Sequence, residues 1–174
     1  DENPAILLQN PMFQIITNRI FDEMAFPLRQ TAIPEAQIRE IVTDWLVKLS
    51  LANLAEQSPY AVSYGELQLV MMAATLIMNK SLILLDEPTS HLDPPFTRQM
   101  AELLEAQRQK NHTVIISSQY AEEYIFCDRI WIMTNGTITG DFPVTSKSET
   151  DARLADQGFP PEHPDELFRE FERK

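Results

Sequence analysis

The sequence is poor in cysteine, with 1 in 174 residues, and it has no long apolar run. A single thiol, Cys127, excludes an internal disulfide framework and fits a reducing compartment. Apolar runs such as Leu82 to Leu85 are far too short to cross a bilayer, which takes about 20 residues. No positively charged segment followed by an apolar one opens the sequence, so secretion is not expected.

Basic residues are also scarce, with 14 Lys and Arg against 26 Asp and Glu and a net charge of −12. Such a surface repels phosphate backbones, so no nucleic-acid partner is expected. It gains little from anionic lipid, so any membrane attachment would go through a protein partner. ATP is not excluded, because backbone N–H groups, a lysine and a metal ion can hold a nucleotide locally.

Glycine is the third shortage, with 4 in the chain. None of them begins the spacing G-x-x-x-x-G-K-[ST] of a phosphate-binding loop. Such a loop needs glycines because its N–H groups turn inward in conformations that a Cβ would obstruct. The four positions are Gly65, Gly136, Gly140 and Gly158.

Helices are expected to dominate residues 12–80, after a short strand from Ala5 to Leu8. Thr17 is expected to cap a helix that ends near Pro27, and Pro34 to open the next helix. Ser63 and Glu66 have the spacing of a capping box before a nearly all-apolar helix. The second helix carries apolar residues at i, i+3, i+4 and i+7, namely Ile38, Ile41, Val42, Trp45, Leu46 and Leu49.

Strands and helices alternate over residues 81–140. The apolar run 82–85, a helix over 95–110 and a strand over 113–117 predict a βαβ unit with a parallel strand pair. Asn135-Gly136 predicts a type I′ hairpin. The polar tail from Pro143 is expected to carry a helix over 164–171.

Two carboxylates, Asp86 and Glu87, directly follow the buried strand, where open α/β sheets bind their ligands. Asp86 is placed to hold Mg²⁺ and Glu87 to polarise an attacking water. The alternative is a solvated acidic turn. Upstream, residues 63–66 lie at the N-terminus of a predicted helix. The free N–H groups there could bind an anion, and the alternative is an ordinary helix cap.

Four segments in order resemble the motifs of ABC ATPases over residues 5–140. Asp86 to Asp93 (Asp-Glu-Pro-Thr-Ser-His-Leu-Asp) resembles the Walker B segment and D-loop, and Ser63-Tyr64-Gly65-Glu66 resembles the signature motif. Gln9 resembles the glutamine of the Q-loop, and Gln119 falls at the switch histidine. The resemblance implies an α/β fold with a parallel-sheet core and a helical subdomain.

The subtype resembled is the ATPase subunit of energy-coupling-factor importers, which carry vitamins or metal ions such as cobalt and nickel. Four stretches carry this resemblance: Gln9-Asn10-Pro11 with Gln14, Phe21 to Phe26, Ser58-Pro59-Tyr60 and Gly158 to Pro161.

Several positions depart from the family pattern. The phosphate loop (Walker A), which the family places before the Q-loop, is absent, and the simplest expectation is an N-terminal truncation. Tyr64 replaces a signature glycine, Leu69 stands where an arginine is usual, and Gln119 replaces a histidine that can carry a proton. We therefore expect slow or absent hydrolysis at this chain's own site, and none by the chain alone.

The resemblance implies four regions: a core strand and Q-loop (1–11), a helical subdomain with the signature (12–80), an α/β core (81–142) and a C-terminal extension (143–174). Its implied cofactors are ATP and Mg²⁺. Catalysis would use Glu87 and Gln119, and Asp86 and Gln9 would hold the metal ion. The nucleotide would contact Gln9, Ser63, Tyr64, Gly65, Glu66 and Asp93.

The implied partners are a second ABC ATPase subunit and a transmembrane subunit received near Met12 to Phe26. The implied location is the cytoplasmic face of the membrane, or the cytoplasm for the chain alone. Two alternatives remain: a degenerate, non-hydrolysing regulatory subunit paired with an active ATPase, which Tyr64, Leu69 and Gln119 favour, and a soluble ABC protein acting on ribosomes.

Overall fold

The computed structural model describes residues 3–90 and 92–160. They form two compact units, the first ending at Ser117 and the second beginning at Ser118. The first unit holds the parallel sheet and four α-helices, and the second holds a β-hairpin and one α-helix. The α/β fold class expected from the sequence is confirmed.

The sheet of the first unit has three parallel strands in the order β1 (Ala5–Leu7), β2 (Leu82–Asp86) and β3 (Thr113–Ser117). In register, Leu7 lies beside Leu85 and Leu85 beside Ile116. Leu7 and Leu85 are buried, whereas Ile6 and Ile115 on the other face are about half exposed. The parallel register brings the carboxyl ends of all three strands to one edge of the sheet.

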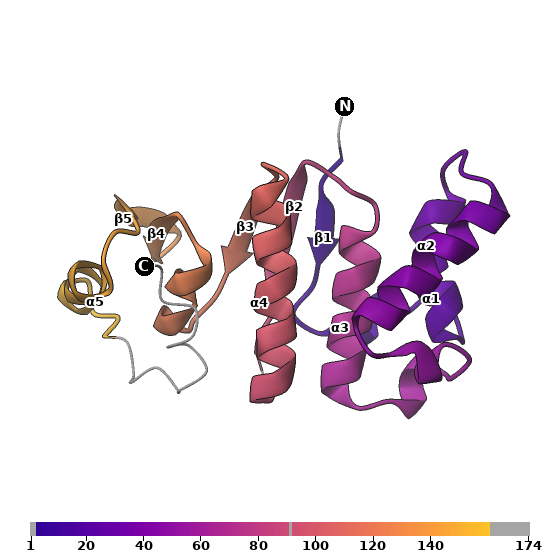
Figure 1. The fold of residues 1–174 in the computed structure, drawn as a ribbon. Coiled ribbons are helices and arrows are strands. Elements are labelled where there is room, and N and C mark those ends of the chain that lie inside the picture. Colours follow the sequence, from indigo (N-terminus) through magenta and orange to yellow (C-terminus); the bar gives the residue numbers. More distant parts are fainter. Residues whose placement is uncertain (1–2, 91, 161–174) are drawn as a thin grey trace. The chain divides into compact units, whose positions relative to one another are not determined.

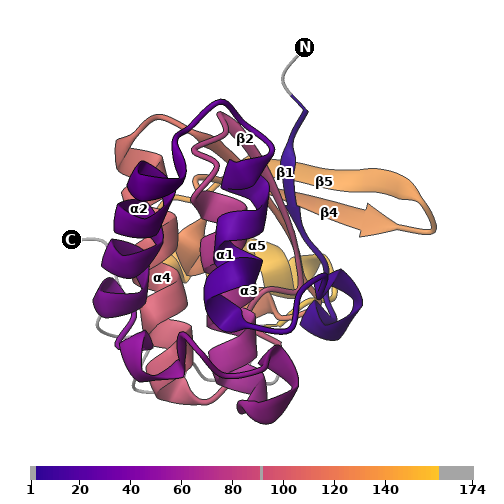
Figure 2. The ribbon, with the colours of Figure 1, turned by 90° about the vertical axis from the view of Figure 1, so that its right-hand side faces the viewer.

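Helices α3 (Tyr64–Leu76) and α4 (Pro94–Gln109) lie side by side against the sheet, α3 by β1 and α4 by β3 (Figure 1). Helix α3 is buried on every side from Leu67 to Leu76, as its apolar sequence predicted. Helices α1 (Ile20–Arg29) and α2 (Glu35–Lys48) pack beyond α3 (Figure 2). The expected helical region between the first two strands is therefore confirmed.

The expected N-cap of α1 was wrong. Its N-cap is Arg19 rather than Thr17, and the helix ends at Arg29, two residues beyond Pro27. Thr17 instead donates from its backbone N–H and its hydroxyl to the carboxylate of Glu23. Pro34 is the N-cap of α2, one residue before the helix begins. The side chain of Thr17 is thus bonded to a residue of α1 six positions later instead of capping the helix.

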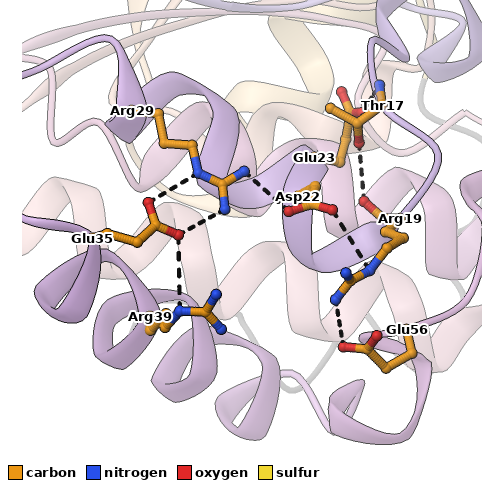
Figure 3. A network of polar contacts seen from close by, with 8 residues as sticks. All are labelled: Thr17, Arg19, Asp22, Glu23, Arg29, Glu35, Arg39 and Glu56. Carbon is orange, nitrogen blue, oxygen red and sulfur yellow. Dashed lines mark hydrogen bonds and ion pairs between the residues drawn. The ribbon is translucent and has the colours of Figure 1, made fainter.

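Short 3-10 helices connect these elements at Pro11–Gln14, Ala52–Leu54 and Pro59–Ala61. A network of ion pairs joins the start of α1 to α2 and to the segment before Pro59 (Figure 3). In it, Arg29 contacts Glu35 at 2.8 Å and Asp22 at 3.0 Å, and Arg19 contacts Glu56 at 2.6 Å. These side chains are partly exposed, so each pair contributes little to stability.

The second unit contains a 3-10 helix (Ala121–Phe126), β4 (Arg129–Thr134), β5 (Thr137–Pro143) and α5 (Lys147–Asp156). Asn135 and Gly136 turn the antiparallel hairpin with φ values of 50° and 76°, as a type I′ turn requires. Its core is Tyr124, Ile132, Phe142 and Leu154. Helix α5 was not expected from the sequence, and the helix expected over 164–171 lies outside the described residues.

Within residues 3–90 and 92–160, no helix combines the length and apolar character that a membrane span requires.

Candidate functional site

The carboxylates Asp86 and Glu87 lie where β2 ends, beside the ends of the other two strands. Ser117, the last residue of β3, donates a short hydrogen bond from its hydroxyl to Asp86. The carbonyl oxygen of Ser117 accepts from the N–H of Glu87 at 2.9 Å. Sequence reasoning did not single out Ser117, although its place at the end of the next strand was the available signal.

Gln9, which follows β1, reaches across this edge. Its side-chain Nε2 donates to Oε2 of Glu87 at 2.9 Å. Two residues separated by 78 positions in the sequence are thus in direct contact. The parallel register, which sets Leu7 beside Leu85, brings Gln9 next to Glu87.

The backbone of Glu87 is strained. Its φ is 43°, in the left-handed region that non-glycine residues avoid, at a cost of about 1–2 kcal/mol. The surrounding turn is held by the buried side chain of Gln68, whose Nε2 donates to the carbonyl oxygen of Pro88 at 3.1 Å. The N–H of Ser90 donates to the carbonyl oxygen of Glu87 at 3.2 Å. Strain kept in place by surrounding contacts is typical of functional residues.

The segment from Ser63 to Glu66 forms the start of α3. Ser63 and Glu66 make the expected capping box, with Glu66 Oε2 accepting from the N–H of Ser63 at 2.8 Å. Gly65 is buried against the ring of Phe96 in α4, and a Cβ there would come within 2.5 Å of the ring. This glycine is therefore required for close packing of α3 on α4, whatever it does toward a nucleotide.

Tyr64 is the first residue of α3, and its phenol points back to the Q-loop. The hydroxyl donates to the carbonyl oxygen of Gln9 at 3.2 Å. Burial raises the pKa of the Tyr64 phenol, so the group remains a protonated donor at neutral pH. Leu69, the other departure within this helix, is fully buried and belongs to the core.

The remaining expected residues lie elsewhere. Asp93 is exposed and is the N-cap of α4, where its carbonyl oxygen accepts from Phe96 and Thr97. Gln119 is exposed, two residues beyond the end of β3, and belongs to the second unit. Hydrogen bonds therefore connect Tyr64 to Gln9 and Gln9 to Glu87. Ser117 connects Glu87 to Asp86.

The donor set at the sheet edge fits a hard cation in company with a phosphate. No group of three or more His, Cys, Asp or Glu side chains forms a metal cage within the described ranges. A Mg²⁺ ion is commonly held by one or two carboxylates together with water and substrate phosphates. Asp86 supplies one such carboxylate, and Gln9, at the same edge of the sheet, carries an amide oxygen.

Comparison with known proteins agrees with this geometry. A family model described as "AAA domain, putative AbiEii toxin, Type IV TA system" matches residues 7–119, which include the strand-end residues and the start of α3. The chain belongs to this AAA-domain family. It is also homologous to the ATPase domains of ABC transporters, as its relatives show.

One relative is the energy-coupling factor transporter ATP-binding protein EcfA1 of Mycoplasmoides gallisepticum, 33% identical over 79% of this chain and 49% of that protein. Another is the ABC transporter ATP-binding protein GSU1281 of Geobacter sulfurreducens, 32% identical over 87% of this chain and 60% of that protein. The chain thus spans about half of the curated relatives that it matches.

Solved structures show the same fold. The cbiO1 protein of Clostridium perfringens, part of a cbiONQ transporter complex, superposes with a TM-score of 0.71 at 24% identity, over 88% of this chain and 59% of that one. The ATP-binding cassette MJ0796, a dimer bound to ADP and phosphate, gives a TM-score of 0.74 at 21% identity, over 83% of this chain and 64% of that one. The expected ABC ATPase fold is confirmed.

Proposed function

We propose that this chain is part of an ATP-binding subunit that couples ATP binding and hydrolysis to import of a vitamin or metal ion across a membrane. The observation that carries the proposal is the contact of Gln9 with Glu87 at the edge where the three parallel strands end. Homology to ABC transporter ATP-binding proteins supports it, and the relative EcfA1 supports the energy-coupling-factor type.

The strand-end residues have distinct chemical roles in this proposal. Mg-ATP, when bound, supplies the phosphoryl group and a cation that neutralises its charge. Asp86 and Gln9 would hold the cation. Glu87 orients a water molecule and accepts its proton, a role that its partial exposure at the strand end permits. Gln9 exchanges its contact with Glu87 for one with the nucleotide and so reports occupancy to the helical region.

A second ATPase subunit completes the arrangement. Ser63, Tyr64, Gly65 and Glu66, at the N-terminal end of α3, face the nucleotide of this partner, because free helix N–H groups favour phosphate. Asp93 orders the contact between the two subunits. Gln119 stands where the family has a histidine, and a glutamine there donates a hydrogen bond without carrying charge, so turnover is slow.

A transmembrane subunit docks on the segment between β1 and α1. This segment exposes three apolar side chains, Met12 at 40%, Phe13 at 81% and Ile16 at 64%. Glu23 anchors the segment by accepting from the N–H groups of Ile16 and Thr17. Such an anchored apolar surface suits a helix of a membrane protein, and this supports our proposal that the chain works at the cytoplasmic face of the membrane.

The chain alone binds Mg-ATP weakly and does not hydrolyse it. No glycine-rich phosphate loop occurs in its sequence, and that loop supplies several N–H contacts to the phosphates in proteins that have it. The complete function therefore requires a phosphate loop and the partner subunits.

The test is ATP hydrolysis by the assembled transporter carrying Glu87→Gln. We expect kcat to fall by about two orders of magnitude, because the side chain no longer accepts a proton, while KM for ATP changes little. Glu40→Gln, an exposed carboxylate of α2, is the matched control and should leave both constants unchanged.

A second candidate is a non-hydrolysing regulatory subunit paired with an active ATPase. The presence of Tyr64 at a signature glycine and of Gln119 at the switch position favours it. In that case Glu87→Gln would leave both hydrolysis and transport unchanged, which is the outcome that contradicts the first proposal.

A further inference from the structure

The phenol of Tyr64 bridges two motifs that lie 55 residues apart in the sequence. Its hydroxyl donates to the backbone carbonyl oxygen of Gln9 at 3.2 Å. The glycine usual at this signature position has no side chain, so this contact is a property of the substitution. Tyr64, which departs from the family pattern, therefore makes a hydrogen bond within this chain.

Gln9 makes its other contact through its side chain. While its carbonyl oxygen receives the Tyr64 hydroxyl, its Nε2 donates to Glu87 at 2.9 Å. One residue thus connects the start of α3 with the carboxylate at the end of β2. The three residues Tyr64, Gln9 and Glu87 form a continuous hydrogen-bonded series, called here the clasp.

The two ends of the clasp are fixed more firmly than its middle. The capping box of Ser63 and Glu66 and the packing of Gly65 on Phe96 hold the first turn of α3. The strained turn at Glu87 is held by the N–H bond to Ser117. Gln9, by contrast, is exposed and lies just beyond the last residue of β1.

The loop after Gln9 depends on side chains for its hydrogen bonds. Gln14 accepts from the N–H of Leu8 at 2.8 Å and donates to the carbonyl oxygen of Ile6 at 3.0 Å. Asn10 accepts from the N–H of Met12 at 3.0 Å. The N–H of Phe13 adds a bond to the carbonyl oxygen of Asn10 at 3.2 Å, and the bond from Tyr64 ties this loop to the first turn of α3.

We propose that Tyr64 is a positioning residue whose phenol holds the Q-loop so that the amide of Gln9 stays on Glu87 in the resting chain. A displacement of the start of α3, as when a second subunit engages it, withdraws the phenol and frees Glu87 to bind water. The effect on hydrolysis rests on the proposed function, whereas the clasp itself does not.

Hydrogen exchange of the full chain tests the clasp directly. Tyr64→Phe removes one oxygen and keeps the ring. We expect exchange at the N–H groups of Leu8, Met12 and Phe13 to become about threefold to tenfold faster, the effect of losing one neutral hydrogen bond. Tyr60→Phe is the matched control, since Tyr60 is 62% exposed in a neighbouring 3-10 helix. Tyr64→Leu should act like Tyr64→Phe.

ATP hydrolysis by the assembled transporter tests the consequence. Tyr64→Phe should raise the basal kcat about threefold, whereas a general loss of structure would lower it. Unchanged exchange in both Tyr64 variants would overturn the clasp, and faster exchange with unchanged kcat would overturn its effect on Glu87. Faster exchange in an assembly that never hydrolyses ATP would leave the clasp standing and refute the proposed function.

Discussion

Two regions of the first unit use glutamate in opposite ways. At the start of α1, Glu23 is 3% exposed and accepts hydrogen bonds from the backbone of Ile16 and from both the backbone and the hydroxyl of Thr17. At the end of β2, Glu87 is partly exposed, has a left-handed backbone and accepts a hydrogen bond from the exposed amide of Gln9. One carboxylate fixes the chain and the other is held ready to change partners.

The two glutamates differ in their hydrogen-bond partners and exposure, and residue type alone does not distinguish them. The buried carboxylate of Glu23 accepts from the backbone N–H groups of Ile16 and Thr17, so its removal affects the fold. The contact of Glu87 comes from an exposed side chain of a short loop, so exchange of that contact is easy. Removal of the Glu23 side chain should therefore lower the free energy of unfolding. Removal of the Glu87 side chain should instead remove the proposed chemistry without lowering it.

The largest effect is expected from Glu23→Ala. It leaves the N–H groups of Ile16 and Thr17 without their acceptor in a partly buried turn, which should lower the free energy of unfolding by about 2–3 kcal/mol. Urea unfolding followed by circular dichroism measures this loss. Glu40→Ala, an exposed position in α2, should change it by less than about 0.5 kcal/mol. Equal stability of both variants would remove the distinction between the two glutamates.

A smaller effect of opposite sign is expected from Glu87→Gly. Glycine adopts the φ of 43° without steric cost, so the free energy of unfolding should rise by about 1 kcal/mol while the candidate catalytic group is lost. Thermal unfolding measures it. Asn79→Gly is the matched control, since Asn79 has a φ of 50° and asparagine tolerates that region better. A destabilised Glu87→Gly variant would show that the backbone there is not strained.

The smallest effect is expected at the exposed ion pair of Arg29 and Glu35. The hydrogen bond from Arg29 holds the pKa of Glu35 below its ordinary value of 4.5. The folded state therefore favours the charged carboxylate, so the contribution is present above pH 4.5 and is lost as the pH falls through the lowered pKa. Unfolding of Glu35→Gln from pH 7 to pH 3 should show a slightly weaker pH dependence than the native chain. An unchanged dependence would mean that the pair contributes nothing.

Much of the first unit could be predicted from sequence because its signals are local. The capping box of Ser63 and Glu66, the apolar circumference of α3 and the run 82–85 each fix an element without reference to distant residues. The start of α1 could not be predicted, because Thr17 had a buried acceptor, Glu23, that no spacing rule includes. Helix α5 was missed in a polar segment, although Ser146 caps it by accepting from Glu149.

In the candidate site, too, local patterns could be predicted from sequence and tertiary contacts could not. Asp86 and Glu87 were recognisable because two carboxylates after an apolar strand are a local pattern. The partners Ser117 and Gln68 were not, since one depends on strand register and the other on a buried contact between α3 and the turn. Tyr64 was predicted to weaken the site of a partner subunit, which nothing yet tests. Its bond to Gln9 came only from the structure.

The sequence by itself determined the order of the elements, the α/β class and the residue types at the strand ends, because periodicity, caps and apolar runs act over a few residues. Only the tertiary structure decided which of those residues touch. The parallel register sets Gln9 beside Glu87, and the packing of α3 brings the phenol of Tyr64 to Gln9. Contacts between residues 78 and 55 positions apart depend on the tertiary packing of the chain, which local propensities do not determine.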